Sequence, residues 1–343
     1  VEADDHATLA AILATPRPPW LEPLIAPAGS PQTKPRALNV ALELAPFGLL
    51  TVYDAEDEPH PEQLKEAAAT FAAGGSDLAC LQAPLRIRTL GRSPTWLERQ
   101  FAHEYAALFE VILPAIVRLG LPIPLGGTSN HFRVEILKSV GGWDPWNVTE
   151  DADLGFRLTR MGYRTGILTR ATRESAPPAF RAWLPQRTRW LKGFMQTMIV
   201  HLRHPFDLGW RGLAALMLTL GAAIASAALQ GPVLAWITAS LLVHGLNRSW
   251  PDFTVANLGL LLLGWLVAIW TVRIGARRTS AHFSILDAVS SPLYWSLTSL
   301  AQVHAAWRLV FQPSHWDKTP HQPDLEVRKP LRRALRFRAS LPT

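Results

Sequence analysis

Carboxylates gather in two short strings of this sequence, and the first follows an apolar stretch. Asp54, Glu56 and Asp57 come directly after residues 49–53, which have the composition of a short strand. Side chains at the carboxyl end of a strand are well placed to bind ligands in α/β sheets. Carboxylate oxygens suit a hard cation such as Mg2+ or Mn2+, which can neutralise a diphosphate leaving group. The alternative is a solvated acidic turn.

The second acidic string opens a predicted helix. Glu150 and Asp151 follow Thr149, a residue type that favours the N-cap position. The helix dipole favours the ionised carboxylates, and a general base for a sugar hydroxyl must be ionised and within hydrogen-bond reach. We predict that Asp151 is such a base. Ordinary helix capping explains the same residues equally well.

A third string combines an amide, a cation and an aromatic ring. Gln186, Arg189 and Trp190 are spaced by three and four residues, so they share one face of a predicted helix over 180–200. Arg offers paired donors to a diphosphate, and Trp offers a flat surface on which a sugar ring can stack. The alternative is an interfacial helix beside a membrane, where Arg and Trp are common.

Three charged residues near the start are weaker candidates. Asp4 and Asp5 end an apolar stretch and could bind the base or ribose of a nucleotide, but a cap for the following helix is an equal alternative. Lys34 precedes a predicted helix and could counter a phosphate charge, although an exposed lysine is the simpler interpretation. No histidine, His131 included, has convincing metal-ligand spacing.

The order of the predicted elements favours an α/β fold. Strand-like stretches at 49–53 and 78–83 alternate with helical patterns at 34–44 and 63–71. This alternation predicts a sheet with helices on both faces. The first five residues read like the end of a buried strand, so we expect the chain to be a fragment whose beginning is missing.

Long uncharged runs follow this part of the chain. Residues 212–243 and 254–272 contain no charged side chain, and each is long enough to cross a hydrocarbon core of about 30 Å. The first could instead break into a hairpin at residues 231–232. The basic run 273–278 predicts a cytoplasmic side. Residues 289–311 are interrupted by polar side chains, so we interpret them as interfacial or re-entrant, with a full span as the lesser option.

Composition excludes some classes of function. The 343 residues carry a net charge of +7, but many basic residues lie beside the apolar runs and in the tail, and no nucleic-acid motif accompanies them. We therefore expect no nucleic-acid partner. The single cysteine, Cys80, lies in a strand-like stretch and indicates a buried thiol in a reducing compartment.

The strings 54–57, 149–151 and 186–190, followed by membrane spans, resemble the processive family-2 glycosyltransferases, to which cellulose synthase and hyaluronan synthase belong. The segments 126–132 and 315–319 are similar to a bacterial exopolysaccharide branch of that group. The resemblance implies a GT-A fold, in which a mixed central sheet flanked by helices binds a nucleotide-diphospho-sugar. It also implies a divalent metal, Mg2+ or Mn2+, and inversion at the anomeric carbon.

The resemblance also implies roles for single residues, with Asp151 as the catalytic base. The donor side would comprise Asp4, Asp5, Lys34 and Asp54. The metal ligands would be drawn from Asp54, Glu56 and Asp57, and which pair binds is left open. The diphosphate and acceptor end would comprise Gly127, Thr128, Ser129, Asn130, His131, Glu150, Gln186, Arg189 and Trp190.

We therefore predict a GT-A domain over 1–200 that lacks its first strand, interfacial and transmembrane helices over 201–311, and a basic cytoplasmic tail over 312–343. The expected activity is inverting transfer from a UDP-sugar or related donor to a growing polysaccharide at the bacterial inner membrane. The alternatives are single-sugar transfer to a polyprenyl phosphate carrier and a non-catalytic scaffold. Expected partners are the nucleotide sugar, a glycan acceptor, membrane lipid and export-complex subunits. Without its start, the chain should be weakly active or inactive.

Overall fold

A mixed four-stranded sheet forms the centre of the molecule. The computed structural model describes residues 1–88, 93–247 and 252–313. The strands lie in the order β1 (Leu49–Val52), β5 (Asn130–Arg133), β3 (Leu78–Gln82) and β6 (Arg164–Ile167). Strand β5 is antiparallel to both of its neighbours, and β6 is parallel to β3. The prediction of a mixed sheet is confirmed.

A smaller sheet lies beside the acidic string. Its three strands have the order β2 (Glu58–Pro59), β7 (Thr172–Glu174) and β4 (Leu85–Ile87). Strand β7 is antiparallel to β2 and parallel to β4. Because β2 directly follows residues 54–57, this pairing holds the end of the acidic string next to the strand that ends at Glu174.

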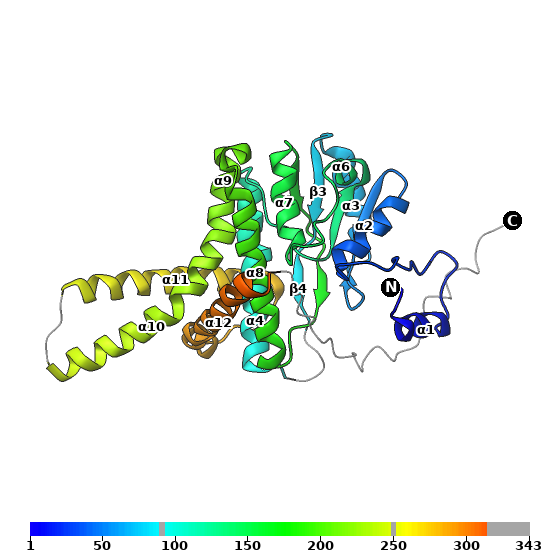
Figure 1. Cartoon of the computed structure of the whole chain (residues 1–343). Helices are drawn as coiled ribbons and strands as arrows, with labels where there is room; N and C mark the ends of the chain where they lie inside the picture. Colours follow the sequence, from blue (N-terminus) through cyan, green and yellow to red (C-terminus); the bar gives the residue numbers. More distant parts are fainter. Residues whose placement is uncertain (89–92, 248–251, 314–343) are drawn as a thin grey trace.

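Helices pack on both faces of the larger sheet (Figure 1). They are α2 Lys34–Leu44, α3 Gln63–Ala73, α4 Trp96–Ala107, α5 Leu113–Arg118, α6 Val134–Ser139 and α7 Glu150–Arg160, with a π-helical turn Leu108–Ile112 between α4 and α5. Helix α1 His6–Ala14 lies apart from the sheet and has no buried residue. Phe71 of α3 packs in one core cluster with Leu81 of β3. Phe132 of β5 and Leu154 of α7 belong to the other, larger cluster. The sheet is therefore buried on both faces, as its apolar strands require.

The first residues do not form the predicted strand. Glu2 makes a single bridge to Ala26, and Asp4 and Asp5 are exposed. Asp5 instead caps α1, since its Oδ1 accepts a hydrogen bond from the backbone N–H of Thr8 at 3.0 Å. The capping alternative explains Asp5, because its carboxylate satisfies a helix N–H that would otherwise lack a partner.

Long helices make up the rest of the described chain. They are α8 Phe180–Leu202, the 3-10 turn Pro205–Leu208, α9 Gly209–Leu216, the π-helical turn Met217–Gly221, α10 Ala222–Asn247, α11 Asp252–Thr279 and α12 Ile285–Phe311. Figure 1 shows α10 and α11 projecting together away from the sheets. The helix continues through Pro232, so the hairpin alternative at 231–232 is wrong.

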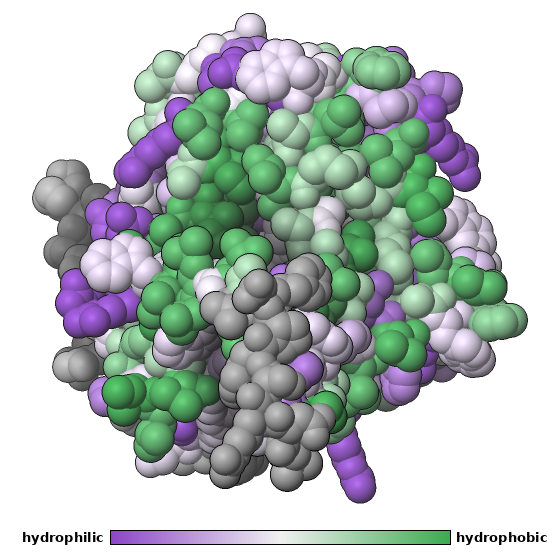
Figure 2. Space-filling view, turned by 90° about the vertical axis from the view of Figure 1, so that its left-hand side faces the viewer, coloured by the Kyte–Doolittle hydropathy of each residue, from purple (hydrophilic) through white to green (hydrophobic). Residues whose placement is uncertain are grey.

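Two helical segments are long and apolar enough to cross a membrane. They are Pro205–Gly245, with mean hydropathy 2.0, and Ala256–Thr279, with mean hydropathy 1.9. Large apolar side chains such as Leu263 and Trp270 of α11 are exposed. Figure 2 shows apolar side chains over much of the face at this end of the molecule. Such a surface suits lipid better than water.

Helix α12 runs unbroken over the segment that we interpreted as interfacial or re-entrant, and it packs through Ala301 and Ala305 in a cluster with Leu191 of α8. It does not belong to the two candidate spans found among the described residues. Residues 314–343, most of the predicted basic tail, lie outside the described residues.

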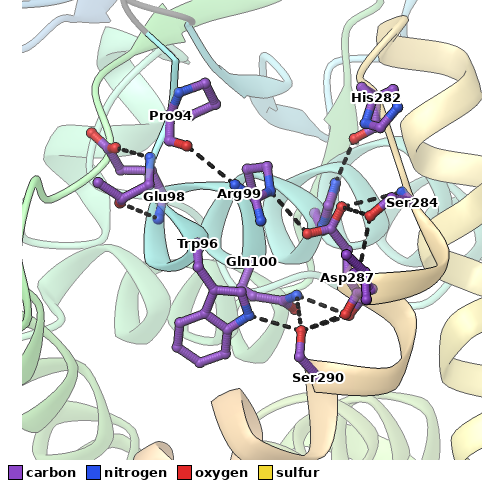
Figure 3. Close-up of polar contacts among 12 residues, drawn as sticks. Pro94, Trp96, Glu98, Arg99, Gln100, His282, Ser284, Asp287 and Ser290 are labelled. Carbon is purple, nitrogen blue, oxygen red and sulfur yellow. Dashed lines mark hydrogen bonds and ion pairs between the residues drawn. The ribbon is translucent and has the colours of Figure 1, made fainter.

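A polar joint connects α4 to α12, and Figure 3 shows its side chains facing one another. Arg99 Nε donates to Asp287 Oδ1 at 2.9 Å, and Gln100 Nε2 donates to the main-chain oxygen of Asp287 at 2.9 Å. Trp96 Nε1 donates to Ser290 Oγ at 2.8 Å. The joint fixes the last described helix to the helix that runs beside the sheets.

Candidate active site

One cavity of about 1380 Å³ collects most of the residues singled out in the sequence. Those that line it are Lys34, Asp54, Glu56, Asp57, Gly127, Thr128, Glu150, Asp151, Gln186, Arg189 and Trp190. We call this part the polar end. Elsewhere the same cavity is lined by α10 and α11, with aliphatic side chains such as Ile237, Leu261 and Ile269, and we call that part the apolar end.

The acidic loop 54–57 is closed by its own last carboxylate. Asp57 Oδ2 accepts a hydrogen bond from the backbone N–H of Asp54 at 3.0 Å, and it also accepts one from the Thr128 hydroxyl. Burial raises the pKa of Asp57. Asp57 thus fixes the loop against the turn that precedes β5, and the Asp54 carboxylate lies at the polar end of the cavity.

Lys34, the first residue of α2, joins the acidic loop to the glycine turn at 126–127. Its ammonium forms an ion pair with Asp54 and donates to the main-chain oxygen of Gly127 at 2.6 Å. The interpretation of Lys34 as an exposed lysine is therefore wrong. A cation fixed at this point lies where an anionic ligand of the cavity would meet it.

Glu150 and Asp151 form a close acidic pair at the start of α7. Asp151 Oδ1 accepts from the N–H of Ala152 at 2.7 Å, and a Cβ on Gly127 would lie 3.4 Å from Asp151 Oδ2. Burial raises the pKa of both carboxyl groups, and the charge of Asp151 raises that of Glu150 further. The helix dipole alone predicted readily ionised groups, but here the effect of burial is larger.

Helix α8 approaches the start of α7 closely, because it carries a glycine at the contact. A Cβ on Gly193 would lie 2.4 Å from Thr149 Oγ1, so a larger residue there would push the helices apart. This contact brings the α8 residues Gln186, Arg189 and Trp190 to the same cavity as Asp151.

Arg187 of α8 also lines the cavity, and it has partners on two other helices. It is buried, forms an ion pair with Glu104 of α4, and donates to Tyr294 Oη of α12 at 3.0 Å. Its guanidinium carbon lies 4.7 Å from the ring centre of Trp190 and 5.0 Å from that of Phe101. Arg187 therefore holds Trp190 in place through cation–π contact and ties α8 to two other helices.

The structure does not bring Asp4 and Asp5 to the cavity, although both were predicted to face the nucleotide. Asp4 Oδ2 accepts a hydrogen bond from Gln32 at 3.0 Å, and Asp5 caps α1. Neither lines the cavity. Both carboxylates have local partners on the surface, which accounts for their position without a ligand.

The predicted acceptor segment 127–131 divides into two parts. Gly127 and Thr128 line the cavity, whereas Ser129, which precedes β5, and Asn130 and His131 of β5 are buried outside it. Ser129 Oγ donates to Thr172 Oγ1 at 2.6 Å, and Asn130 donates to the main-chain oxygen of Gly126. His131 Nδ1 lies 2.8 Å from Thr51 Oγ1, and burial lowers the pKa of His131 to about 4. Each of these three buried side chains therefore has a partner within the protein that accounts for its position without a ligand.

Sequence reasoning did not find Glu174, Glu104 or Tyr105, which also line the cavity. Burial, followed by the nearby carboxylates of the acidic loop, raises the pKa of Glu174 to about 8. Its position at the end of a three-residue strand is a weak signal in one sequence, since β7 is identified only by its pairing partners β2 and β4.

The donor atoms of the acidic loop suit a hard divalent cation, because they are carboxylate oxygens. Within residues 1–88, 93–247 and 252–313, no cluster of three or more His, Cys, Asp or Glu side chains is arranged around a common metal position. Asp54 is paired with Lys34. The residues thus fit the metal by type, and the present arrangement pairs one of the ligands with a lysine.

Comparison with known proteins identifies the family. The sequence model described as Glycosyl transferase family group 2 matches residues 49–307. The UDP-forming cellulose synthase of Dictyostelium discoideum is 29% identical over 194 residues, which is 53% of this chain and 17% of that protein. Beta-monoglucosyldiacylglycerol synthase of Synechocystis is 27% identical over 188 residues, 54% of this chain and 38% of that protein. The chain thus spans well under half the length of these relatives.

A solved structure is also similar. The mannosyltransferase PcManGT from Pyrobaculum calidifontis, in complex with GDP-Man and Mn2+, aligns with a TM-score of 0.48 at 16% identity over 84% of this chain and 69% of that one. The family match extends over the acidic loop, the Glu150–Asp151 pair and the α8 residues that meet at the polar end. The chain therefore belongs to glycosyl transferase family group 2, and two of the helices that follow its sheets are apolar enough to span a membrane.

Proposed function

We propose that this protein is a membrane-bound, inverting glycosyltransferase that moves a sugar from a nucleotide-diphospho-sugar, with a UDP-sugar as the leading donor, onto a growing polysaccharide. The observation that carries the proposal is the meeting of Lys34, Asp54 and Asp151 with the α8 residues Arg189 and Trp190 in one cavity. These residues lie far apart in the sequence and come from separate elements.

Asp151 is the proposed catalytic base. It removes the proton from the acceptor hydroxyl as that oxygen forms a bond to the anomeric carbon of the donor. The bond between the anomeric carbon and the diphosphate oxygen breaks on the opposite side, so the configuration at this carbon inverts. The nucleoside diphosphate leaves with the bonding electrons, and Arg189 and Lys34 are the cations that interact with the acidic groups of this end.

Asp54 and Glu56 are the proposed ligands of the divalent cation. Asp57 already accepts two hydrogen bonds inside the loop, so its proposed role is to fix the loop. When bound, the cation supplies charge that neutralises the departing diphosphate. Lys34, which pairs with Asp54 and donates to the main-chain oxygen of Gly127, is the proposed protein cation that would bind the diphosphate.

Trp190 and Gln186 are proposed to hold the acceptor sugar near Asp151, with Gly127 and Thr128 on the opposite side. Different sugars can stack on a tryptophan ring, but the ring restricts the orientation in which each sugar binds. The same surface can be used repeatedly as a glycan grows, which favours polymerisation. We further propose that the spans place this chemistry at the cytoplasmic face of a bacterial inner membrane, beside export-complex subunits.

A second candidate function is the transfer of one sugar to a lipid carrier such as a polyprenyl phosphate. The specific observation in its favour is the apolar end, where α10 and α11 line the same cavity that contains Asp151. An apolar tail could lie between these helices while its head group reaches the base.

Release of the nucleoside diphosphate from a panel of nucleotide sugars tests the proposal. The full-length protein in membranes should release it from one donor, with a requirement for Mg2+ or Mn2+ and for an acceptor. The length of the product then decides between the two candidates, because a polymerase extends each acceptor by many sugars. No release from any donor, or unchanged glycan output with Asp151→Asn, would point to a scaffold instead.

A further inference from the structure

Glu174 lies at the polar end and has no role in the mechanism above. It is the last residue of β7, and its main-chain oxygen accepts a hydrogen bond from the N–H of Arg88 at 2.9 Å, which fixes the backbone there. Its side chain lines the cavity. Oε1 of this side chain is buried and has no hydrogen-bond partner in the described part of the chain.

A buried carboxyl oxygen without a partner is costly. An unsatisfied buried polar group destabilises a protein by about 1–3 kcal/mol, and native structures contain few of them. A ligand that brings hydroxyl groups into the cavity would remove the cost, since each hydroxyl can donate to this oxygen.

The neighbours of Glu174 place it on the donor side of the cavity. Its strongest charge interactions are with the acidic loop, followed by Lys34. Strand β7, which ends at Glu174, pairs with β2 through Arg173 and Glu58, and Glu58 directly follows the acidic loop. Glu174 therefore lies beside the loop that carries the proposed ligands of the cation. A diphosphate oxygen would not donate to a carboxyl group, whereas the sugar attached to it carries hydroxyl groups that do.

We propose that Glu174 determines donor specificity by hydrogen-bonding hydroxyl groups of the sugar in the nucleotide-diphospho-sugar. This inference rests on the proposed function, because it needs the donor to bind at the polar end. Glu174 acts on the sugar and has no part in proton transfer or in binding the nucleotide.

The test compares the full-length protein with Glu174→Leu and Glu174→Gln. The probes are the nucleotide sugar that the wild type turns over and the corresponding free nucleoside diphosphate. Glu174→Leu should raise the Kd for the nucleotide sugar about tenfold or more, the scale of one lost hydrogen bond to a buried group, and leave the Kd for the nucleoside diphosphate unchanged. The Kd of Glu174→Gln for the nucleotide sugar should lie between those of the wild type and of Glu174→Leu. Arg173→Leu, an exposed change on the same strand, is the matched control and should alter neither.

An equal loss of affinity for both probes would overturn the proposal, because it would assign Glu174 to the diphosphate side. Unchanged affinity for the nucleotide sugar would overturn it as well. If Glu174→Leu does not fold, Glu174→Gln should still change the ratio of kcat/KM between two donors that differ at one hydroxyl, and an unchanged ratio contradicts the inference. A wild type that turns over no nucleotide sugar refutes the proposed function itself, which is a separate result.

Discussion

The polar end of the cavity and the α10–α11 pair are held by different forces. At the polar end, Lys34 bridges Asp54 and Gly127, and Asp57 closes its own loop with Thr128. Along α11, by contrast, large apolar side chains such as Leu263 are exposed. Lys34, Asp54 and Asp57 find their partners inside the described chain, whereas the apolar helix requires a surrounding that the described chain does not supply.

This difference in forces corresponds to a difference in what each region can do. Hydrogen bonds and ion pairs are directional, so they can fix carboxylates and a ring at the angles that a displacement reaction needs. Apolar contact has no direction, so α10 and α11 can provide a lipid-facing surface without fixing the chemistry. The ion pairs Arg99–Asp287 and Arg187–Glu104 tie α4, α8 and α12 together, and α12 is in turn bonded to α10, because the N–H of Gly231 donates to Ser299 Oγ.

The largest expected effect falls on the polar end. Asp151→Asn keeps the shape of the side chain but cannot accept a proton, so kcat should fall by about 10³-fold. The measurement is nucleoside diphosphate release at saturating donor. Donor affinity and thermal stability should be retained, which separates lost chemistry from lost structure. A loss below tenfold would assign the base to another residue.

The next effect falls on the apolar helix. Leu263→Asp places a charge on the exposed face of α11, which should disfavour membrane insertion by about 3 kcal/mol. The readout is the fraction of protein that stays in alkali-washed membranes. Leu64→Asp is a matched control, because Leu64 of α3 is 56% exposed and Leu263 is 59% exposed. Equal behaviour of the two variants would argue against a lipid surrounding for α11.

A change in the connection between the regions should have a smaller effect. Arg187→Met removes the cation that pairs with Glu104 and lies against Trp190, so the free energy of unfolding should fall by about 2 kcal/mol. Glu104 is 40% exposed, which limits the loss because water can solvate its carboxylate. Activity should fall with it, since Trp190 loses its support. Chemical denaturation in detergent measures the first effect, and a neutral outcome would show that the ion pair is dispensable.

The acidic pair should control the pH dependence. Because burial raises the pKa of Asp151, the base should lose its activity on acidification at a pH above the ordinary carboxylate range. Burial and the charge of Asp151 raise the pKa of Glu150 above that of Asp151, so Glu150 is protonated where Asp151 titrates, and Glu150→Gln should leave the acid limb of the kcat/KM profile in place. For an acid with a raised pKa in the folded state, stability falls as pH rises above the unfolded pKa, and Glu150→Gln should reduce this fall. An acid limb that moves down in Glu150→Gln would contradict this order of ionisation, because it would show that Glu150 is charged where Asp151 titrates.

The smallest effect belongs to the start of the chain. Asp5→Ala removes the cap of α1 and should cost at most about 1 kcal/mol of local stability, with no change in donor affinity. Isothermal titration calorimetry with the nucleotide sugar measures this affinity. A loss of donor affinity would restore the nucleotide-binding role that the sequence suggested for this residue.

The sequence was most informative where a pattern is local. The helix at Lys34–Leu44 and the strand at Leu49–Val52 match their predicted spans, because helical spacing and an apolar run leave little choice there. For the Gly127–His131 segment the sequence predicted five residues at the cavity, but only the first two line it. The sequence does not show where the turn ends and central strand β5 begins. Glu174 and the partner of Arg187 were not found, since both depend on contacts between elements far apart in the chain.

A structure of the full-length protein with an unreactive nucleotide-diphospho-sugar analogue and Mn2+ tests the central claim most directly. The account predicts the diphosphate between Lys34, the acidic loop and Arg189, with the anomeric carbon facing Asp151 across the space for one acceptor oxygen, about 3 Å from that carbon. A nucleotide bound beside Asp4 and Asp5, or anywhere else outside this cavity, would contradict it.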